Sequence, residues 1–550
     1  MQNKIVIIGN EAINKIVHGV NVLADIVGMT LGPAGKTVVL QDQFDQPKVT
    51  KDGVTVARHV SFSDPIINTG AAIVLQAAKR TVEEVGDGTT TSTVLAQHLV
   101  NSSINLVKEG LSAKDIVKGM RLAQSAVIEQ INNQKIEPTE KLLVGIATTS
   151  MNGDSEIGEL IGKAMWELGP QASFNVEAGM VSGINIEKIK GIRFDRGFQS
   201  PLFINDAKTG SSDYKKPLIL LTDMKIETLP PNMVALMEEC LSNNNPFIIM
   251  CEEMKGNALQ RLLIAKHRGS PISVVKVPAY GHGKIAVLED LAAILGAKVI
   301  SEQRGETLNN VKVSHLGKCD RMISTKNHTI IYGGNGTEEA IKERFDLMQH
   351  TLDTTTDAME KFVVESRFRR LKGGLMLIKI AGDTPSETDE LKDRVDDAVH
   401  AVKAAYNNGV TVGGGMALQN AVYATDVANE NWNVAVQKGY EIVENACYSL
   451  FDKMLESSQF DTSNLYAEKK VGTVIGGRIG IDFSTGEVCD LVERGIVDPT
   501  SASINALQNA VSVAITILNI GGVVVNDPND IHLNGPAFNF DNGKTGEDNI

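Results

Sequence analysis

Apolar side chains recur every three or four residues along two long stretches of the chain, 11–130 and 408–518. The spacing is clearest in INKIVHGVNVLADIV and IVLQAAKRTVEEV. This spacing brings the apolar positions to one face of an α-helix, so both stretches are predicted to be mostly helical. A short strand pair is predicted inside the first stretch, at KTVVLQD and PKVTKDG, on either side of a turn at 44–47.

The middle of the chain has a different pattern. The compact apolar runs PLILLTD, NPFIIMCE, PISVVKV and AKVISE alternate with helical stretches. Such alternation is typical of an α/β unit. The pattern alone therefore predicts an α-rich fold that is interrupted by an α/β insertion. The polar and aperiodic segment 526–550 is predicted to be disordered.

Size and charge narrow the class of protein. A chain of 550 residues is too long for one core and indicates about three domains. The net charge of −14, with no cluster of Lys or Arg, argues against nucleic-acid binding. The apolar tract 510–525 is interrupted by Asn519, Gly521 and Gly522, so a buried helix that runs into a strand is expected and not a membrane span.

The pattern at the N-terminus and the spacing of the cysteines lead us to expect a cytosol-like compartment. The N-terminus lacks the charged segment and the sustained apolar run of a signal peptide. The five cysteines form no CxxC pair and have no His cluster near them. They are therefore expected to be reduced thiols and not metal ligands.

The stretch TLGPAGKT looks at first like the end of a P-loop, because Gly-Lys-Thr closes that motif. A P-loop also requires a Gly five residues before Gly35, and that position is Thr30. The stretch is therefore not a Walker A loop. Its role has to be inferred from the rest of the chain.

A better candidate for a phosphate site is the stretch GDGTTTSTVLAQ. Asp87 and Gly88 predict a tight turn, and Thr89, Thr90 and Thr91 begin an apolar helix. The free N–H groups and positive dipole end of a helix bind anions, and the Asp87 carboxylate could hold Mg²⁺. The alternative is a plain helix N-cap, although one cap needs only one such residue.

Three further segments carry candidate groups. Lys51 and Asp52 lie in VTKDGVTVA, where a surface turn is the alternative. Asp396 and Asp397 lie on a predicted helix in RVDDAVHA, where a solvated helix face is the alternative. A triple glycine follows this helix and would let a ligand approach the backbone closely. Asp498 lies further on, in GIVDPTSA.

These motifs occur together in a recognisable order. TLGP, KDGVTVA, DGTTTSTVLAQ, RVDDAVHA, the triple glycine and GIVDPT follow one another over most of the chain. In this combination the chain resembles the group I chaperonins, the GroEL-type ring proteins, over residues 1–525. The stretches GVNVLADIVGMTLGP and FDRGFQSPLFI add to the match.

The resemblance implies a multidomain α+β chaperonin fold. A mostly helical equatorial domain that binds ATP is implied at 1–133 and 408–525. A small intermediate hinge domain is implied at 134–189 and 375–407. An α/β apical domain that binds clients is implied at 190–374, and the disordered tail would follow at 526–550.

The resemblance also assigns roles to single residues. Asp397 is implied to act as general base or to orient the attacking water, with help from Asp52. Asp87 is implied to hold Mg²⁺, and K⁺ is a further implied cofactor. ATP binding is implied for Thr30, Leu31, Gly32, Pro33, Lys51, Asp87, Gly88, Thr89, Thr90, Thr91, Gly414, Asp482, Phe483, Ser484, Ile496 and Asp498.

Clients of the family bind to apolar faces of the apical domain. The matching positions here are Phe198, Phe203, Met233, Leu236, Met237, Leu259, Leu262, Leu263 and Ile264. A single apolar stripe is usually a helix that faces its own core. The segment KIETLPPNMVALMEECL carries more apolar residues than one stripe needs, so we expect an exposed client-binding face there.

The chain departs from the family pattern at several places. Asp482-Phe483-Ser484 stands where the family has Asn-Ala-Ala or Asp-Ala, so Phe483 would either stack on adenine or crowd it. AYGHGK replaces GFGDRRK, and the final Gly-Met repeat is absent. Residues 447–475 align poorly, and the family's contacts between two stacked rings lie there. One ring is therefore better supported than two.

The implied function is an ATP-driven folding cycle in the cytoplasm of a bacterium or of a virus-infected bacterial host. A ring of seven identical subunits would capture non-native proteins, prevent their aggregation and release them into a chamber, with a lid co-chaperonin as a candidate partner. The alternatives are a holdase without a productive cycle, a small-molecule kinase and a purely structural ring. The intact Asp52, Asp87 and Asp397 favour the cycle, and no acceptor site for a kinase substrate is visible.

Overall fold

The structure is a computed structural model that describes residues 4–41, 47–85, 88–169, 173–179, 183–189, 191–207, 209–277, 283–372, 375–425, 432–458 and 477–527. The predicted tail lies outside the described residues from 528 onward. The chain divides into two compact units. Unit 1 comprises Met1–Glu167, Met180–Gly183 and Ile380–Ile550, and unit 2 comprises Leu168–Gly179 and Ile184–Lys379.

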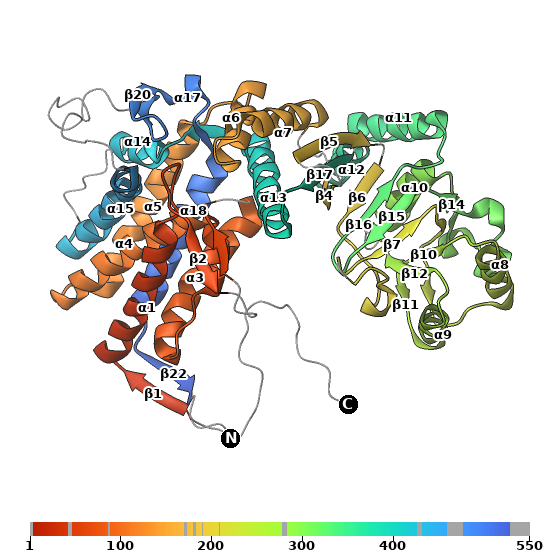
Figure 1. Ribbon diagram of the computed structural model, residues 1–550, viewed down its shortest axis with the longest axis horizontal. Coiled ribbons are helices and arrows are strands. Elements are labelled where there is room, and N and C mark those ends of the chain that lie inside the picture. The colour runs from red at the N-terminus through yellow and green to blue at the C-terminus, as the bar shows by residue number, and fades with distance from the viewer. Residues whose placement is uncertain are drawn as a thin grey trace. The chain divides into compact units, whose positions relative to one another are not determined.

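Unit 1 is mostly helical, as the periodicity predicts (Figure 1). Its helices are α1 (Asn10–Gly28), α2 (Gly53–His59), α3 (Pro65–Val85), α4 (Thr89–Lys108), α5 (Ala113–Asn133), α6 (Glu140–Ser150), α7 (Ser155–Leu168), α13 (Pro385–Asn408), α14 (Met416–Ala424), α15 (Val434–Ser458), α17 (Leu491–Arg494) and α18 (Thr500–Leu518). Close helix packing requires small residues, since a Cβ on Gly19 of α1 would meet the carbonyl of Ile67 in α3.

Among the described helices, only α18 is long and apolar enough, by length and composition, to cross a membrane. It packs against α3, α4 and α5, and it buries an apolar stripe that includes Ala506, Leu507, Ala510 and Ala514. The strand β22 (Gly522–Asn526) follows it. The chain therefore uses α18 as a core helix that runs into a strand, as predicted.

The strands of unit 1 form small antiparallel pairs. β1 (Lys4–Ile8) pairs with β22, and β2 (Val38–Gln41) pairs with β3 (Pro47–Thr50). β18 (Val410–Val412) pairs with β21 (Val497–Pro499), and β19 (Ile479–Asp482) pairs with β20 (Glu487–Asp490). The β2–β3 pair confirms the strand pair that the sequence predicts.

Unit 2 contains a sheet in the order β12-β10-β8-β13, with β14 paired to β8. The four apolar runs predicted as strands are β8 (Leu218–Thr222), β10 (Phe247–Cys251), β12 (Ile272–Lys276) and β13 (Val299–Ile300), and they are parallel. β14 is Gly317–Lys318. The helices that alternate with the strands are α8 (Pro231–Ser242), α9 (Gly256–His267) and α10 (Gly283–Leu295). The predicted α/β insertion is confirmed.

Three smaller sheets complete unit 2. The four-stranded sheet has the order β6-β16-β15-β7, with β6 (Gly191–Phe194), β7 (Ser212–Lys215), β15 (Arg321–Ser324) and β16 (Thr329–Tyr332). A three-stranded sheet has the order β4-β17-β5, with β4 (Ser173–Ala178), β5 (Gly183–Ile189) and β17 (Leu375–Ala381). β9 (Lys225–Ile226) pairs with β11 (Glu253–Met254). The 3₁₀ turns are η1 (Pro201–Phe203), η2 (Glu302–Arg304), η3 (Leu308–Asn310) and η4 (Val313–His315).

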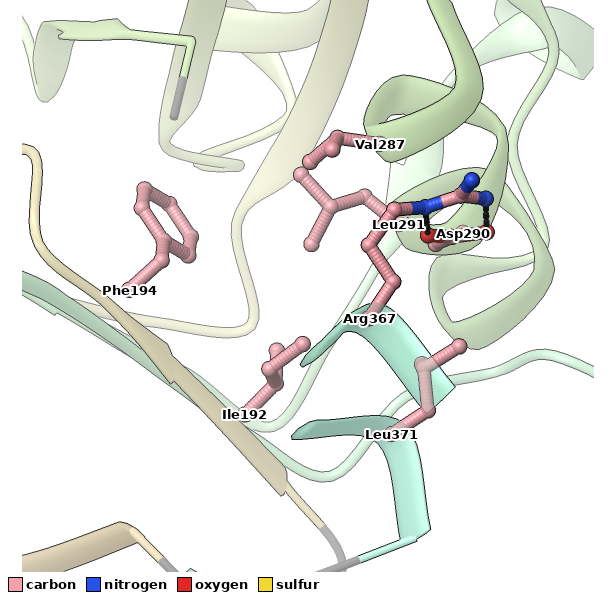
Figure 2. A pocket seen from close by; sticks show the side chains of 7 residues that line it. All are labelled: Ile192, Phe194, Val287, Asp290, Leu291, Arg367 and Leu371. Carbon is pink, nitrogen blue, oxygen red and sulfur yellow. Dashed lines mark hydrogen bonds and ion pairs between the residues drawn. The ribbon is translucent and has the colours of Figure 1, made fainter. Parts of the chain in front are cut away.

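Two arginines hold a buried carboxylate of α10 and so attach α11 (Glu338–Thr354) and α12 (Ala358–Lys372) to it. Asp290 is 3% exposed and accepts hydrogen bonds from Nε of Arg344 and Nε of Arg367, both at 2.7 Å. Figure 2 shows Arg367 against Asp290, beside a small apolar pocket lined by Ile192, Phe194, Val287, Leu291 and Leu371. A buried charge is tolerated only when it is paired, so this network fixes the three helices to one another.

Candidate functional site

Three of the predicted segments meet near the N-terminal end of α4 in unit 1. The hydroxyl oxygens of Thr30 and Thr90 lie 3.5 Å apart. Gly53 approaches the Thr90 hydroxyl so closely that no Cβ would fit between them. The Lys51 ammonium donates to the carbonyl oxygen of Pro33 at 3.2 Å. TLGP, KDG and the threonine segment therefore form one site.

Asp52 is the N-cap of α2. Its Oδ1 accepts from the backbone N–H of Val54 at 3.0 Å, and its Oδ2 accepts from that of Thr55 at 2.8 Å. The alternative interpretation of KDG as a plain surface turn is therefore too simple, since the carboxylate is held in one orientation next to Lys51.

The start of α4 carries a buried hydroxyl without a partner. The N-cap is Gly88, with a left-handed φ of 94°, so none of the three threonines caps the helix. Thr89 is 6% exposed, and its Oγ1 has no hydrogen-bond partner among the described residues. An unsatisfied buried hydroxyl costs about 1–3 kcal/mol. A phosphate at this helix N-terminus would supply the missing partner, so the residues present fit such a ligand.

The predicted metal ligand, Asp87, lies outside the described residues. Within the described part of the chain, no group of three or more His, Cys, Asp or Glu is arranged to hold a metal ion. The five cysteines are free thiols, as predicted from their spacing.

A second set of predicted residues gathers around the triple glycine. Gly414 and Gly415 have φ values of 63° and 76°, which favour glycine. A Cβ on Gly414 would lie 3.8 Å from the ring of Phe483, and one on Gly413 would lie 3.0 Å from the backbone of Ile496. The β18–β21 register places Asp498 in the strand that pairs with the residues just before this loop.

One methionine of α15 joins the two sets. A Cβ on Gly32, in the TLGP turn, would lie 3.3 Å from Met454, and a Cβ on Gly415 would lie 2.9 Å from the same side chain. A Cβ on Gly88 would lie 3.7 Å from the carbonyl oxygen of Ala502, so Gly88 lies close to the N-terminal end of α18. The TLGP turn and the triple-glycine loop thus both lie close to Met454.

The Asp482-Phe483-Ser484 segment is largely engaged by the chain itself. Asp482 accepts from the backbone N–H of Ser484 at 2.9 Å and lies 3.5 Å from the Arg494 guanidinium. Phe483 is 5% exposed, and its ring centroid lies 5.5 Å from that of Phe451. Whether Phe483 stacks on a base or crowds it stays a prediction.

Asp397 lies on α13, and one turn before it is a residue that the sequence analysis missed. This residue is Arg394: burial lowers the pKa of Lys51, and the positive charge of Arg394 lowers it further. Residues three apart share a helix face, so α13 presents Arg394 and Asp397 on the same side. The only sequence signal for Arg394 was this spacing, which is too common to single out one arginine.

The apolar positions expected to form an exposed face lie mostly in the core of unit 2. Six of the nine are buried in one cluster: Phe198, Phe203, Met233, Leu236, Met237 and Leu262. Leu259 and Leu263 pack partly buried against this cluster, and Ile264 is 53% exposed. The expected exposed face on α8 is therefore wrong for this structure.

The extra apolar residues of α8 have a structural reason. The helix packs against both β10 and η3. Leu308 of η3 belongs to the same buried cluster as Met233. A helix that packs against two elements buries a wider apolar face than a helix that packs against one. The same surplus that suggested an exposed patch is thus used for internal packing.

The chain is similar to known proteins over most of its length. The model of the TCP-1/cpn60 chaperonin family matches residues 23–528. Two solved structures of the chaperonin gp146 from bacteriophage EL 2 (Pseudomonas aeruginosa), in presence of ATP-BeFx, are 21% identical to this chain. Each match covers 95% of this chain and 99% of the gp146 chain, with TM-scores of 0.72 and 0.68. At this identity they show a shared fold over nearly the whole chain.

Proposed function

The chain belongs to the TCP-1/cpn60 chaperonin family as a divergent group I member, and from this premise we propose that it couples ATP hydrolysis to the folding of non-native proteins. The observation that supports the ATP step most directly is the meeting of TLGP, KDG and the start of α4 around the unpartnered Thr89 hydroxyl. A helix N-terminus with a buried hydroxyl and a nearby lysine suits the phosphates of a nucleotide.

Within this proposal, Lys51, Thr89, Thr90 and Thr91, together with Gly88 and the TLGP turn, hold the phosphates. Asp87 would hold Mg²⁺, which would neutralise charge that develops on the phosphate oxygens. Asp397 orients the attacking water, and Asp52 assists from its fixed position at the N-cap of α2. Gly414, Ile496 and Asp498 line the other end of the site, and K⁺ is a further proposed cofactor.

Client capture is proposed for the exposed part of the α9 surface. Ile264 is 53% exposed, and Leu202 of η1 is 68% exposed. The element η1 packs against α9, and the partly buried Leu259 and Leu263 lie on the same helix. Exposed apolar groups of this kind bind unfolded segments without demanding one sequence. The six candidate positions that are buried in the core of unit 2 would pack beneath this surface and hold it in place.

Assembly into a homo-oligomeric ring, a lid co-chaperonin, action in the cytoplasm and the three-domain division also belong to this proposal. A holdase, a structural ring and a small-molecule kinase stay as the alternatives, and none is favoured by a specific contact. ATP-dependent refolding of a non-native protein is the property that separates the proposed chaperone from all three.

The deciding experiment is refolding of a denatured, aggregation-prone enzyme by the full chain, with and without ATP. We expect ATP-dependent recovery with wild type, and loss of recovery and of ATPase activity with Asp397→Ala, which should still bind ATP and client. Lys392→Ala, an exposed change on the same helix, is the matched control and should behave as wild type. Suppressed aggregation with no ATP-dependent recovery, even after addition of a co-chaperonin, would contradict the cycle and leave a holdase.

A further inference from the structure

We propose that Glu177 and Arg321 form a releasable clasp between two sheets of unit 2 and hold these sheets in the arrangement of this structure until nucleotide binds. The sheets are β4-β17-β5 and β6-β16-β15-β7. The release step rests on the proposed ATP function, whereas the clasp itself rests on contacts inside unit 2. These contacts are the two partners of Arg321, the tyrosine beside it and the partial exposure of the ion pair.

Arg321 lies on β15 and is held by its own sheet. Its Nε donates to Oδ1 of Asp213 at 3.0 Å, and its Nη2 donates to Oδ2 at 2.7 Å. Asp213 lies on β7, which pairs with β15 in the four-stranded sheet. The remaining nitrogen, Nη1, donates to Oε2 of Glu177 on β4 at 3.0 Å. Because a guanidinium is a rigid fork, the bonds to Asp213 orient Nη1 towards the other sheet.

Tyr332 of β16 completes the polar part of the interface between the sheets. It is the register partner of Arg321, and its hydroxyl donates to Oε1 of Glu177 at 2.7 Å. The same hydroxyl accepts from Nδ2 of Asn175 at 2.6 Å. Asn175 and Glu177 are two residues apart on β4 and so lie on one face of that strand. Burial, and after it the hydrogen bond to Glu177, raises the pKa of Tyr332, so the phenol stays protonated and donates.

The exposure of the ion pair indicates that it can open. The side chains of Arg321 and Glu177 are 31% and 22% exposed, whereas those of the pair Arg367 and Asp290 are 13% and 5% exposed. A charge that loses its partner in a core is left without solvation, at a large cost, but a charge at the edge of an interface is hydrated instead. Arg321 also keeps Asp213 as a partner, so opening leaves only Glu177 to be hydrated.

The apolar part of the same interface is small. Its buried cluster is separate from the two larger clusters of unit 2 and consists of Ile323, Ile330, Tyr332, Leu375 and Leu377. One further hydrogen bond between the sheets runs from Nη1 of Arg193 to the carbonyl oxygen of Phe174, at 2.9 Å. Only residue 190 separates β5 from β6, and only residues 373–374 separate α12 from β17. These positions coincide with the boundaries predicted between the hinge and apical domains, so the clasp lies where the proposed cycle needs movement.

The test follows Tyr332, whose side chain is 5% exposed, by hydroxyl-radical footprinting and mass spectrometry of the full chain. With Glu177→Gln and no nucleotide, we expect the modification rate of Tyr332 to rise roughly threefold, as loss of a partly exposed charge pair predicts. Tyr214 of the same four-stranded sheet is 6% exposed and is the internal reference that should stay protected. Glu187→Gln removes an ion pair with Lys379 inside the three-stranded sheet, and this matched control should leave Tyr332 protected.

Unchanged protection of Tyr332 in Glu177→Gln would overturn the proposal, because the sheets would then stay together without the charge pair. A rise at both Tyr332 and Tyr214 would also overturn it, since Glu177 would then support the fold of the sheet and not a movable contact. If Glu177→Gln does not fold, Glu177→Asp, which keeps the charge on a shorter side chain, decides by the same two rates.

A second measurement tests the release step, with Mg²⁺ and a non-hydrolysable ATP analogue. In wild type we expect the analogue to raise the modification of Tyr332. In Glu177→Gln the same rise should occur at a roughly threefold lower concentration, because the closed arrangement is less stable. Binding of the analogue without a change at Tyr332 would overturn the release step. Failure of wild type to bind the analogue would refute the proposed ATP function and the release step with it, and the comparison without nucleotide would still decide the clasp.

Discussion

Thr89 places a buried hydroxyl at the positive end of α4, and no described residue donates to it or accepts from it. Its neighbour one turn further on, Thr93, differs in this respect, since the Thr93 hydroxyl donates to the carbonyl oxygen of Thr89 at 2.8 Å. The two threonines are both buried and lie on the same helix. They therefore form a matched pair for testing whether an unpaired group is kept for a ligand.

Thr89→Val removes the unpaired hydroxyl while it keeps the shape of the side chain. We expect the unfolding free energy without nucleotide to rise by about 1 kcal/mol, because the desolvation penalty disappears, and the affinity for ADP to fall. Thr93→Val should lower the unfolding free energy by a similar amount and leave the ADP affinity unchanged. Urea unfolding and calorimetry measure both quantities. A less stable Thr89→Val with normal ADP affinity would show that the hydroxyl does not serve a ligand.

At the scale of single residues, the sequence shows which segments form the candidate site. It does not show which of their side-chain atoms bind a ligand. The motif order predicted that the residues around Thr30, Lys51 and Thr90 belong together, and the structure brings these segments into contact. Arg394 was missed because an arginine on a helix is usually solvated, and its effect on the pKa of Lys51 exists only after folding. Short-range sequence patterns contain no information on an electrostatic effect between residues that lie far apart in the chain.

Among the elements, α8 shows where periodicity stops being informative. The apolar surplus of this helix was correctly noticed, yet the surplus covers β10 and η3 and is not exposed. The parallel strands were easier to predict, since each is one short apolar run that is buried on both faces. The hydrophobic pattern of a helix indicates that one face is apolar. The element that covers this face is determined by the rest of the fold.

The ribbon of β1 and β22 leaves an apolar face uncovered. Val6 and Val524 are register partners, 62% and 63% exposed, and Ile8 on the same face is 74% exposed. A two-stranded ribbon is marginally stable alone, so we expect another copy of the chain to cover it. The β2–β3 hairpin, with Val39 and Val49 exposed, is a second such ribbon and a candidate partner.

Replacing both Val6 and Val524 by Lys should therefore shift the protein from an assembled form towards single chains, because charges would be placed on the face that a second copy covers. Light scattering after size-exclusion chromatography measures the mass. Leu122→Lys, at a 37% exposed position on α5, is the control and should not change the mass. An assembled double variant would show that subunits associate through another surface.

For the molecule as a whole, the contacts divide the chain in a way that the sequence did not predict. The expected hinge domain, 134–189 and 375–407, is shared between the two units, since α6 and α13 lie with unit 1 and β4 and β5 lie mainly with unit 2. The three-domain division stays a prediction. The α-rich ends and the α/β middle were predictable because each has its own period, whereas a small connecting domain has too few residues to show one.

Two compact units with separate cores should respond separately to ligand and to core substitution. With ADP at about one hundred times its Kd, we expect unit 1 to gain about 2.7 kcal/mol, while the transition of unit 2 stays in place. Asp290→Asn removes the negative charge that pairs Arg344 and Arg367 in unit 2, and should lower that transition by about 3 kcal/mol without changing the shift caused by ADP. Scanning calorimetry of the full chain resolves the two transitions. If ADP and Asp290→Asn move one common transition, the units unfold cooperatively, and the nucleotide site is then coupled energetically to unit 2 even without a conformational cycle.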